Sequence, residues 1–113
     1  EEEVRFMTRA VALAAETGDP LLRHYAVALG QAQVRAAEGR VEADALETFA
    51  FVRGLYPEDP VSRHFEALAV AQGGDPAGAL ALWRELLSEG PSRAYWKDMV
   101  RKEMSAARRQ MQK

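Results

Sequence analysis

The stretch from Val61 to Pro91 decides the fold class, and it reads VSRHFEALAVAQGGDPAGALALWRELLSEGP. Two segments rich in alanine and leucine flank the sequence Gly73-Gly74-Asp75-Pro76. Alanine and leucine are the strongest helix formers, whereas glycine, aspartate and proline are typical of turns. The stretch therefore predicts two helices joined by a tight turn.

Similar breakers recur along the whole chain and divide it into six segments, each about one helix long. No stretch alternates apolar and polar residues for long, so strand signals are nearly absent. The sequence thus predicts an all-α fold. The expected helices span Glu2–Glu16, Leu21–Glu38, Glu42–Tyr56, Val61–Gln72, Ala77–Glu89 and Arg93–Met111.

The composition is that of one small globular domain. The chain has 113 residues, of which 48% are hydrophobic and 28% charged, enough for one core and too apolar for wholesale disorder. It has no cysteine, which excludes a disulfide framework, a thiol nucleophile and iron–sulfur or zinc–cysteine sites. Its longest aliphatic run, Ala10–Ala15, is far shorter than the ~20 residues that span a bilayer. Because the chain opens on Glu1, we expect a fragment of a longer protein.

The charge is distributed unevenly. Residues 1–92 contain 8 Arg, no Lys and 15 Asp or Glu, a net charge of −7. Residues 93–113 contain 7 Lys or Arg and 2 acidic residues, a net charge of +5, and they hold all three lysines, Lys97, Lys102 and Lys113. Such a segment is either an interaction tail or a solvated helix end whose cations suit the helix dipole.

An internal repeat emerges when the segments are superposed. One shift along the chain places Trp83 on Phe49 and also Pro91 on Pro57. A second, longer shift places Asp59-Pro60 on Asp19-Pro20, and the Arg-His pair at 63–64 on the pair at 23–24. The difference between the two shifts predicts about six extra residues near the turn inside the first repeat.

The first shift equals the period of tetratricopeptide repeats, which are helix–turn–helix units of about 34 residues. In the second unit Gly74-Asp75 marks the turn, Ala79 is the small residue at the close approach, Trp83 is the large aromatic residue and Pro91 closes the unit. Two short helices cannot bury their apolar stripes alone, so each pair stacks on the next. We therefore expect residues 1–113 to form a single domain of two full repeats, with a leading helix and a C-terminal capping helix.

The run from His24 to Trp96 resembles the C-terminal tetratricopeptide domain of the cytochrome c maturation protein CcmI (CycH) family. Three features carry the resemblance: the Gly39-Arg40-Val41 turn, the second repeat RHFEALAVAQGGDPAGALALWRELL, and Trp96 soon after Pro91. The resemblance implies a domain on the periplasmic side of the bacterial inner membrane, anchored only through an N-terminal part absent here.

The resemblance also implies a function without chemistry of its own. The domain would hold apocytochrome c, by its C-terminal helix, for the haem-ligation components of cytochrome c maturation. No cofactor, metal or nucleic acid is expected, and another amphipathic helical peptide is the alternative ligand. A different class of function, a scaffold for protein assembly or oligomerisation, also stays open.

No group of residues points to catalysis. The two histidines, His24 and His64, have no second histidine or cysteine at ligand spacing. They are instead expected at equivalent positions on one face, where they either line a groove or are solvated or capping histidines. The predicted groove residues are Leu21, His24, Ala28 and Gln31 from the first repeat, and Val61, Arg63, His64, Leu68 and Gln72 from the second, with Arg23 and Arg35 at the edge.

The last segment carries an apolar stripe, Trp96, Met99, Val100, Met104, Ala107 and Met111, with Glu103 close beside it. It is interpreted as the helix that caps the open end of the stack. The alternative is a basic amphipathic helix that contacts anionic lipid or nucleic acid.

Overall fold

The computed structural model describes residues 1–112, and within them the chain is helical throughout. The six helices are α1 (Glu2–Thr17), α2 (Leu22–Ala36), α3 (Ala43–Leu55), α4 (Pro60–Gln72), α5 (Pro76–Leu87) and α6 (Tyr95–Met111). Each boundary lies within two residues of the sequence prediction, so the all-α prediction is confirmed.

The starts of α4 and α5 follow directly from the local sequence. Asp59 and Asp75 each accept a hydrogen bond of 2.9 Å from the amide three residues later, and proline occupies the first helical position after each. Aspartate at this capping position satisfies an amide that has no partner within the helix, and proline there loses no hydrogen bond.

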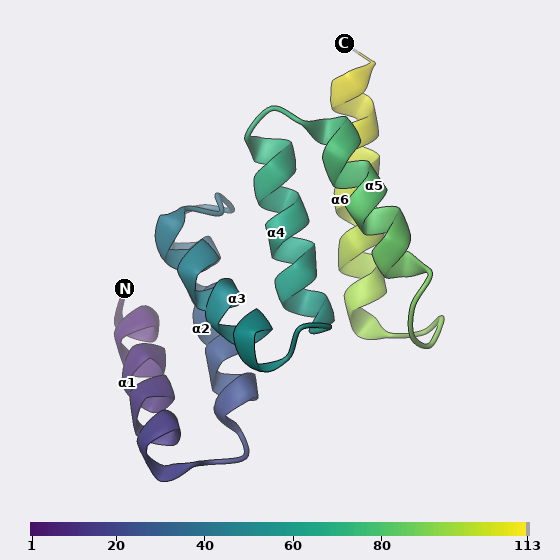
Figure 1. Cartoon of the computed structure of the whole chain (residues 1–113). Coiled ribbons are helices and arrows are strands. Elements are labelled where there is room, and N and C mark those ends of the chain that lie inside the picture. Colours follow the sequence, from purple (N-terminus) through teal and green to yellow (C-terminus); the bar gives the residue numbers. More distant parts are fainter. Residues whose placement is uncertain (113) are drawn as a thin grey trace.

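The helices pack in chain order across the molecule, which measures 48 × 30 × 21 Å (Figure 1). Each helix contacts the next one, and α4 also contacts α6. The array begins with α1 at one end and finishes with α5 and α6 at the other (Figure 1). The molecule therefore consists of two helix pairs, α2–α3 and α4–α5, between a leading and a closing helix.

Aromatic side chains form the centre of the core. Phe49 and Trp83, on the second helix of each pair, are fully buried. Phe49 stacks on Phe65 with the ring centroids 4.9 Å apart, and this contact joins the two pairs. Ala79 is also fully buried, which agrees with the predicted close approach of two helices at this small residue.

The contacts of these aromatic residues correct the predicted repeat register. Trp83 meets His64, whereas Phe49 lies so close to Gly30 that a Cβ atom there would come within 2.5 Å of the ring. Gly30 and His64 are 34 residues apart, and Phe49 and Trp83 are also 34 residues apart. A single period therefore relates both helices of the two pairs, and the prediction of six extra residues near the internal turn is wrong.

The reason lies at the start of the first helix of each pair. Asp19-Pro20 lies just before α2 and Asp59-Pro60 lies at the start of α4, which gives the two pairs the same local sequence signal. However, Gly30 lies eight residues after the start of α2, whereas His64 lies four residues after the start of α4. The first helix pair is thus longer because α2 has additional residues at its N-terminus. These residues precede Gly30, whose contact with Phe49 corresponds to the contact of His64 with Trp83.

Candidate functional site

Two hollows lie along one face of α4 and α6. Val61, Leu68 and Gln72 share a face of α4 by helical spacing, and Trp96, Glu103 and Ala107 share a face of α6. The N-terminal residues of both helices line one hollow and their C-terminal residues line the other. The two helices therefore run in the same direction, and the hollows follow each other along them.

The first hollow, here called the α2–α6 pocket, has a volume of about 330 Å³. The helix α2 closes one side of it, and α4 and α6 close the others. Its lining is mainly apolar, with an exposed histidine and an exposed tyrosine at its edge. The lining includes Arg23, His24, Val27, Val61, Tyr95 and Trp96.

An ion pair fixes one wall of the α2–α6 pocket. The Arg23 guanidinium lies 2.6 Å from the carboxylate of Asp59, which is buried and also caps α4. The same guanidinium stacks over the ring of Tyr56 at 4.6 Å. Arg23 therefore ties α2 to the start of α4, and its charge is already balanced inside the protein.

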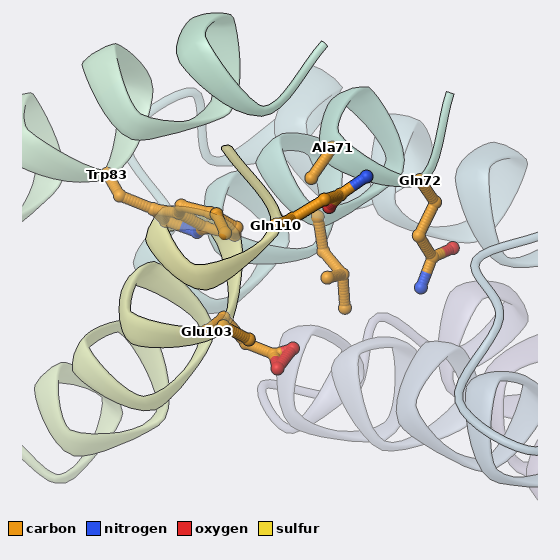
Figure 2. Close-up of a pocket in the computed structure, with 8 residues that line it drawn as sticks. Ala71, Gln72, Trp83, Glu103 and Gln110 are labelled. Atoms are coloured by element: carbon orange, nitrogen blue, oxygen red, sulfur yellow. The ribbon is translucent and has the colours of Figure 1, made fainter. Parts of the chain in front are cut away.

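The second hollow, here called the Glu103 pocket, has a volume of about 160 Å³ and lies between the C-terminal halves of α4 and α6. Figure 2 shows its labelled residues, with Glu103 and Gln110 from α6 facing the pocket beside Ala71 and Trp83. Its lining includes Leu68, Ala71, Gln72, Glu103, Ala107 and Gln110.

Gln72 has a structural role at the rim of the Glu103 pocket. Its side-chain amide donates a hydrogen bond of 2.9 Å to the carbonyl of Gly39 and accepts one of 2.8 Å from the amide of Val41. Gly39 and Glu38 both have left-handed backbone angles in this turn. Gln72 thus clamps the turn between α2 and α3 onto α4.

The structure brings together four of the nine predicted groove residues. His24 and Val61 line the α2–α6 pocket, and Leu68 and Gln72 line the Glu103 pocket. Leu21 is exposed at the cap of α2, and Ala28 and Gln31 are half-buried on α2, outside both pockets. Peptide binding by these positions stays a prediction.

His64 lies in the core, where only 1% of its surface is exposed. Its Nδ1 accepts a hydrogen bond of 3.1 Å from the Trp83 indole N–H, and its ring packs edge-on against Phe65. Burial lowers the pKa of His64 to about 4. His24 is exposed, so the expectation that the two histidines are equivalent on one face is wrong, because the shared period aligns His64 with Gly30 instead.

Arg63 faces away from both pockets. Its guanidinium forms two hydrogen bonds with the Glu89 carboxylate, of 2.7 and 3.0 Å. This pairing raises the pKa of Arg63 and lowers that of Glu89. Arg63 lines a polar hollow among α3, α4 and α5 that also contains the ion pair between Arg53 and Glu66. Arg63, a predicted groove residue, thus lies on another side of α4.

The sequence interpretation missed the contribution of α6 to both pockets. Tyr95, Trp96, Glu103 and Gln110 come from a helix that the sequence analysis interprets as a cap or as a contact with lipid or nucleic acid, and not as part of the peptide groove. The apolar stripe of α6, with Glu103 beside it, was the available signal. The stripe is buried as expected at Trp96, Val100, Met104 and Ala107, and both stripe residues (Trp96, Ala107) and flanking residues (Tyr95, Glu103, Gln110) line the pockets. Lys113, part of the predicted basic tail, lies outside the described residues.

Within residues 1–112, no three acidic or histidine side chains gather as metal ligands. None of the helices in this part of the chain combines the length and apolar character needed to cross a bilayer.

Two curated proteins are similar to this chain. The cytochrome c-type biogenesis protein CycH of Bradyrhizobium diazoefficiens is 38% identical over 72 residues, which is 64% of this chain and 20% of that protein. CycH of Rhizobium meliloti is 37% identical over 70 residues, 62% of this chain and 18% of that protein. The resemblance inferred from the sequence is confirmed as partial homology.

The chain spans about a fifth of the length of these curated relatives. No family model matches the chain, and no solved structure matches it.

Proposed function

We propose that this domain is a tetratricopeptide-type module that holds a helical peptide during the biogenesis of c-type cytochromes. The ligand is the C-terminal helix of apocytochrome c, presented to the components that ligate haem. The domain acts as a maturation factor rather than an enzyme, on the periplasmic side of the inner membrane. The homology to CycH supports the process, and the geometry supports the mode of binding.

The observation that carries the proposal is the pair of pockets along one face of α4 and α6. An amphipathic helix docks by placing side chains one or two turns apart into a groove. Val61 and Leu68 lie seven residues apart on α4, one in each pocket, which is roughly 10 Å along the helix. A ligand helix lying along α4 and α6 would therefore reach both pockets with residues two turns apart.

The tetratricopeptide assignment has its own support. The contact of Gly30 with Phe49 recurs as the contact of His64 with Trp83. The spacing between the two contacts is the length of a tetratricopeptide repeat. Helix pairs packed in chain order are the expected arrangement of such repeats. In this arrangement α2, α4 and α6 are the first helices of successive units, which form the concave side.

The test is a titration of the domain with a fluorescein-labelled peptide of the C-terminal helix of a bacterial apocytochrome c. We expect saturable binding with one peptide per domain, measured by fluorescence anisotropy. A peptide with the same composition in scrambled order is the control, because it keeps the charge but loses the apolar stripe. Equal binding of both peptides, or of neither, would contradict the proposal.

The second candidate, a scaffold that self-associates, rests on the outer face of α1. Phe6 and Leu13 are 70% and 61% exposed there, on a helix that packs chiefly against α2. Sedimentation velocity distinguishes this function, since self-association would raise the sedimentation coefficient with concentration. In that case Leu13→Glu should restore the monomer without any effect on peptide binding.

A further inference from the structure

Among the described residues, Glu103 differs from the other half-buried or buried acidic residues because its carboxylate has no partner. Asp59, Glu66 and Glu89, which are also at least partly buried, each pair with an arginine. Asp19 accepts a backbone hydrogen bond from Leu21. Within residues 1–112, no ion pair or hydrogen bond reaches the Glu103 carboxylate. Within the described residues, this carboxylate is therefore available to pair with a positive charge that a ligand brings.

The surroundings of Glu103 favour a cation over any other occupant. The apolar part of the lining includes Leu68, Ala71, Ala107 and the buried Trp83. The last turns of α4 and α6 reach the same pocket through Gln72 and Gln110, and helix C-termini carry partial negative charge. The arginines near the end of α6, Arg108 and Arg109, are exposed and do not line it.

The size of the pocket restricts the occupant to a single side chain. Its volume of about 160 Å³ is below the roughly 300–1,000 Å³ of sites for small molecules and cofactors. Lysine and arginine bury an aliphatic stem along apolar surface while the charged head finds a polar partner. A mainly aliphatic and aromatic lining with one carboxylate, Glu103, matches that shape and charge; Figure 2 shows Glu103 with Ala71 and Trp83.

We propose that the Glu103 pocket binds a lysine or arginine side chain of the helix that lies in the groove. This inference rests on the proposed function, because it assigns one contact of the same bound peptide. The α2–α6 pocket, which is larger and mainly apolar, receives an aliphatic or aromatic side chain. The two pockets together specify a ligand with a basic residue about two turns from an apolar anchor, and so fix the direction of the bound helix.

The test uses the labelled apocytochrome c peptide and a set of variants in which each basic residue is changed to glutamine, one at a time. One substitution should weaken binding to the wild-type domain by about threefold to tenfold, the range expected for a partly buried charge pair. Glu103→Gln should lower the affinity for the unmodified peptide by the same factor. The Glu103→Gln domain should bind the substituted peptide with no further loss of affinity. Glu16→Gln, an exposed change on α1, is the matched control and should have no effect.

Charge exchange completes the test. Glu103→Arg should lower the affinity for the unmodified peptide. The affinity should recover with a peptide in which glutamate replaces the basic residue whose change to glutamine weakened binding. If wild-type and Glu103→Gln domains bind every peptide of the set with the same affinity, the assignment of Glu103 is wrong and the proposed function stands. If the wild-type domain binds no peptide at all, both the proposed function and the assignment of Glu103 are contradicted. Circular dichroism checks that each variant keeps its helical content.

Discussion

Trp83 Nε1 donates a hydrogen bond of 3.1 Å to His64 Nδ1, and both side chains are buried between α4 and α5. Because the indole N–H can only donate, Nδ1 of His64 must accept and the ring proton resides on Nε2. Protonation of Nδ1 would remove this hydrogen bond and place a charge in the core. The histidine is therefore neutral in the folded protein, in agreement with its lowered pKa.

This contact predicts a loss of stability in acid. The pKa of His64 is about 4 in the folded state and 6.5 in the unfolded chain, so the unfolded state binds more protons between these values. The stabilisation is complete above pH 6.5 and is lost as the pH falls toward 4, by roughly 3 kcal/mol in total. Urea denaturation at several pH values measures this slope.

His64→Gln is the control for the acid effect, since glutamine can accept the indole hydrogen bond but does not titrate in this range. The variant should lose the part of the pH dependence between 4 and 6.5 that belongs to His64. Wild-type and variant curves that run parallel over this range would show that His64 does not carry the effect.

A second prediction concerns the close approach of α2 and α3. Gly30→Ala should destabilise the fold by about 1–3 kcal/mol, because the new methyl group would overlap the buried ring of Phe49. Gly54→Ala in α3 is the matched control, since nothing lies within 4 Å of its Cβ position. There the gain in helix propensity should stabilise the protein by about 0.5–1 kcal/mol. Thermal melts that shift in the same direction for both variants would contradict the alignment of Gly30 with His64.

The sequence was sufficient to predict the helices but not how they meet. Glycine, aspartate and proline mark the turns locally, so the boundaries of the six helices are encoded in short segments. The register between α2 and α4 depends instead on which residue of α2 faces Phe49. Gly30 has no side chain to reveal that role, and the similar Asp-Pro pairs before each helix suggested another alignment.

The candidate site was predicted in part for a related reason. Leu68, Gln72, Val61 and His24 follow from helical spacing along α2 and α4. Several other residues of each pocket come from α6. The position of α6 over α4 depends on tertiary packing. The location of His64 could not be inferred either, because a histidine that accepts a buried hydrogen bond has the same sequence signal as one that lines a groove.

A third prediction separates two roles of one aspartate. Asp59 and Asp75 both cap a helix that begins with proline, but only Asp59 also pairs with Arg23. Asp59→Ala should cost about 2–3 kcal/mol, against about 1 kcal/mol for Asp75→Ala. Chemical denaturation of the two variants measures the difference. Equal losses would mean that the Arg23 pair adds nothing to the junction between the helix pairs.

A fourth prediction follows from the position of Arg63. Arg63→Glu should lower stability, because it places a carboxylate against Glu89, but should change peptide affinity by less than about twofold. Fluorescence anisotropy at low and high salt gives the affinity, and denaturation gives the stability. A marked loss of affinity at low salt, with stability intact, would contradict this prediction and show that Arg63 contributes to peptide binding.

The most direct test of the binding face is the affinity of Leu68→Glu for the labelled apocytochrome c peptide. Leu68 lies in the groove between α4 and α6, so a glutamate there should abolish measurable binding while helicity is kept. Leu46→Glu on α3, at a leucine that lines neither pocket, is the matched control and should bind as the wild-type domain does. Undiminished binding by a folded Leu68→Glu variant would contradict the account and place the peptide elsewhere on the molecule.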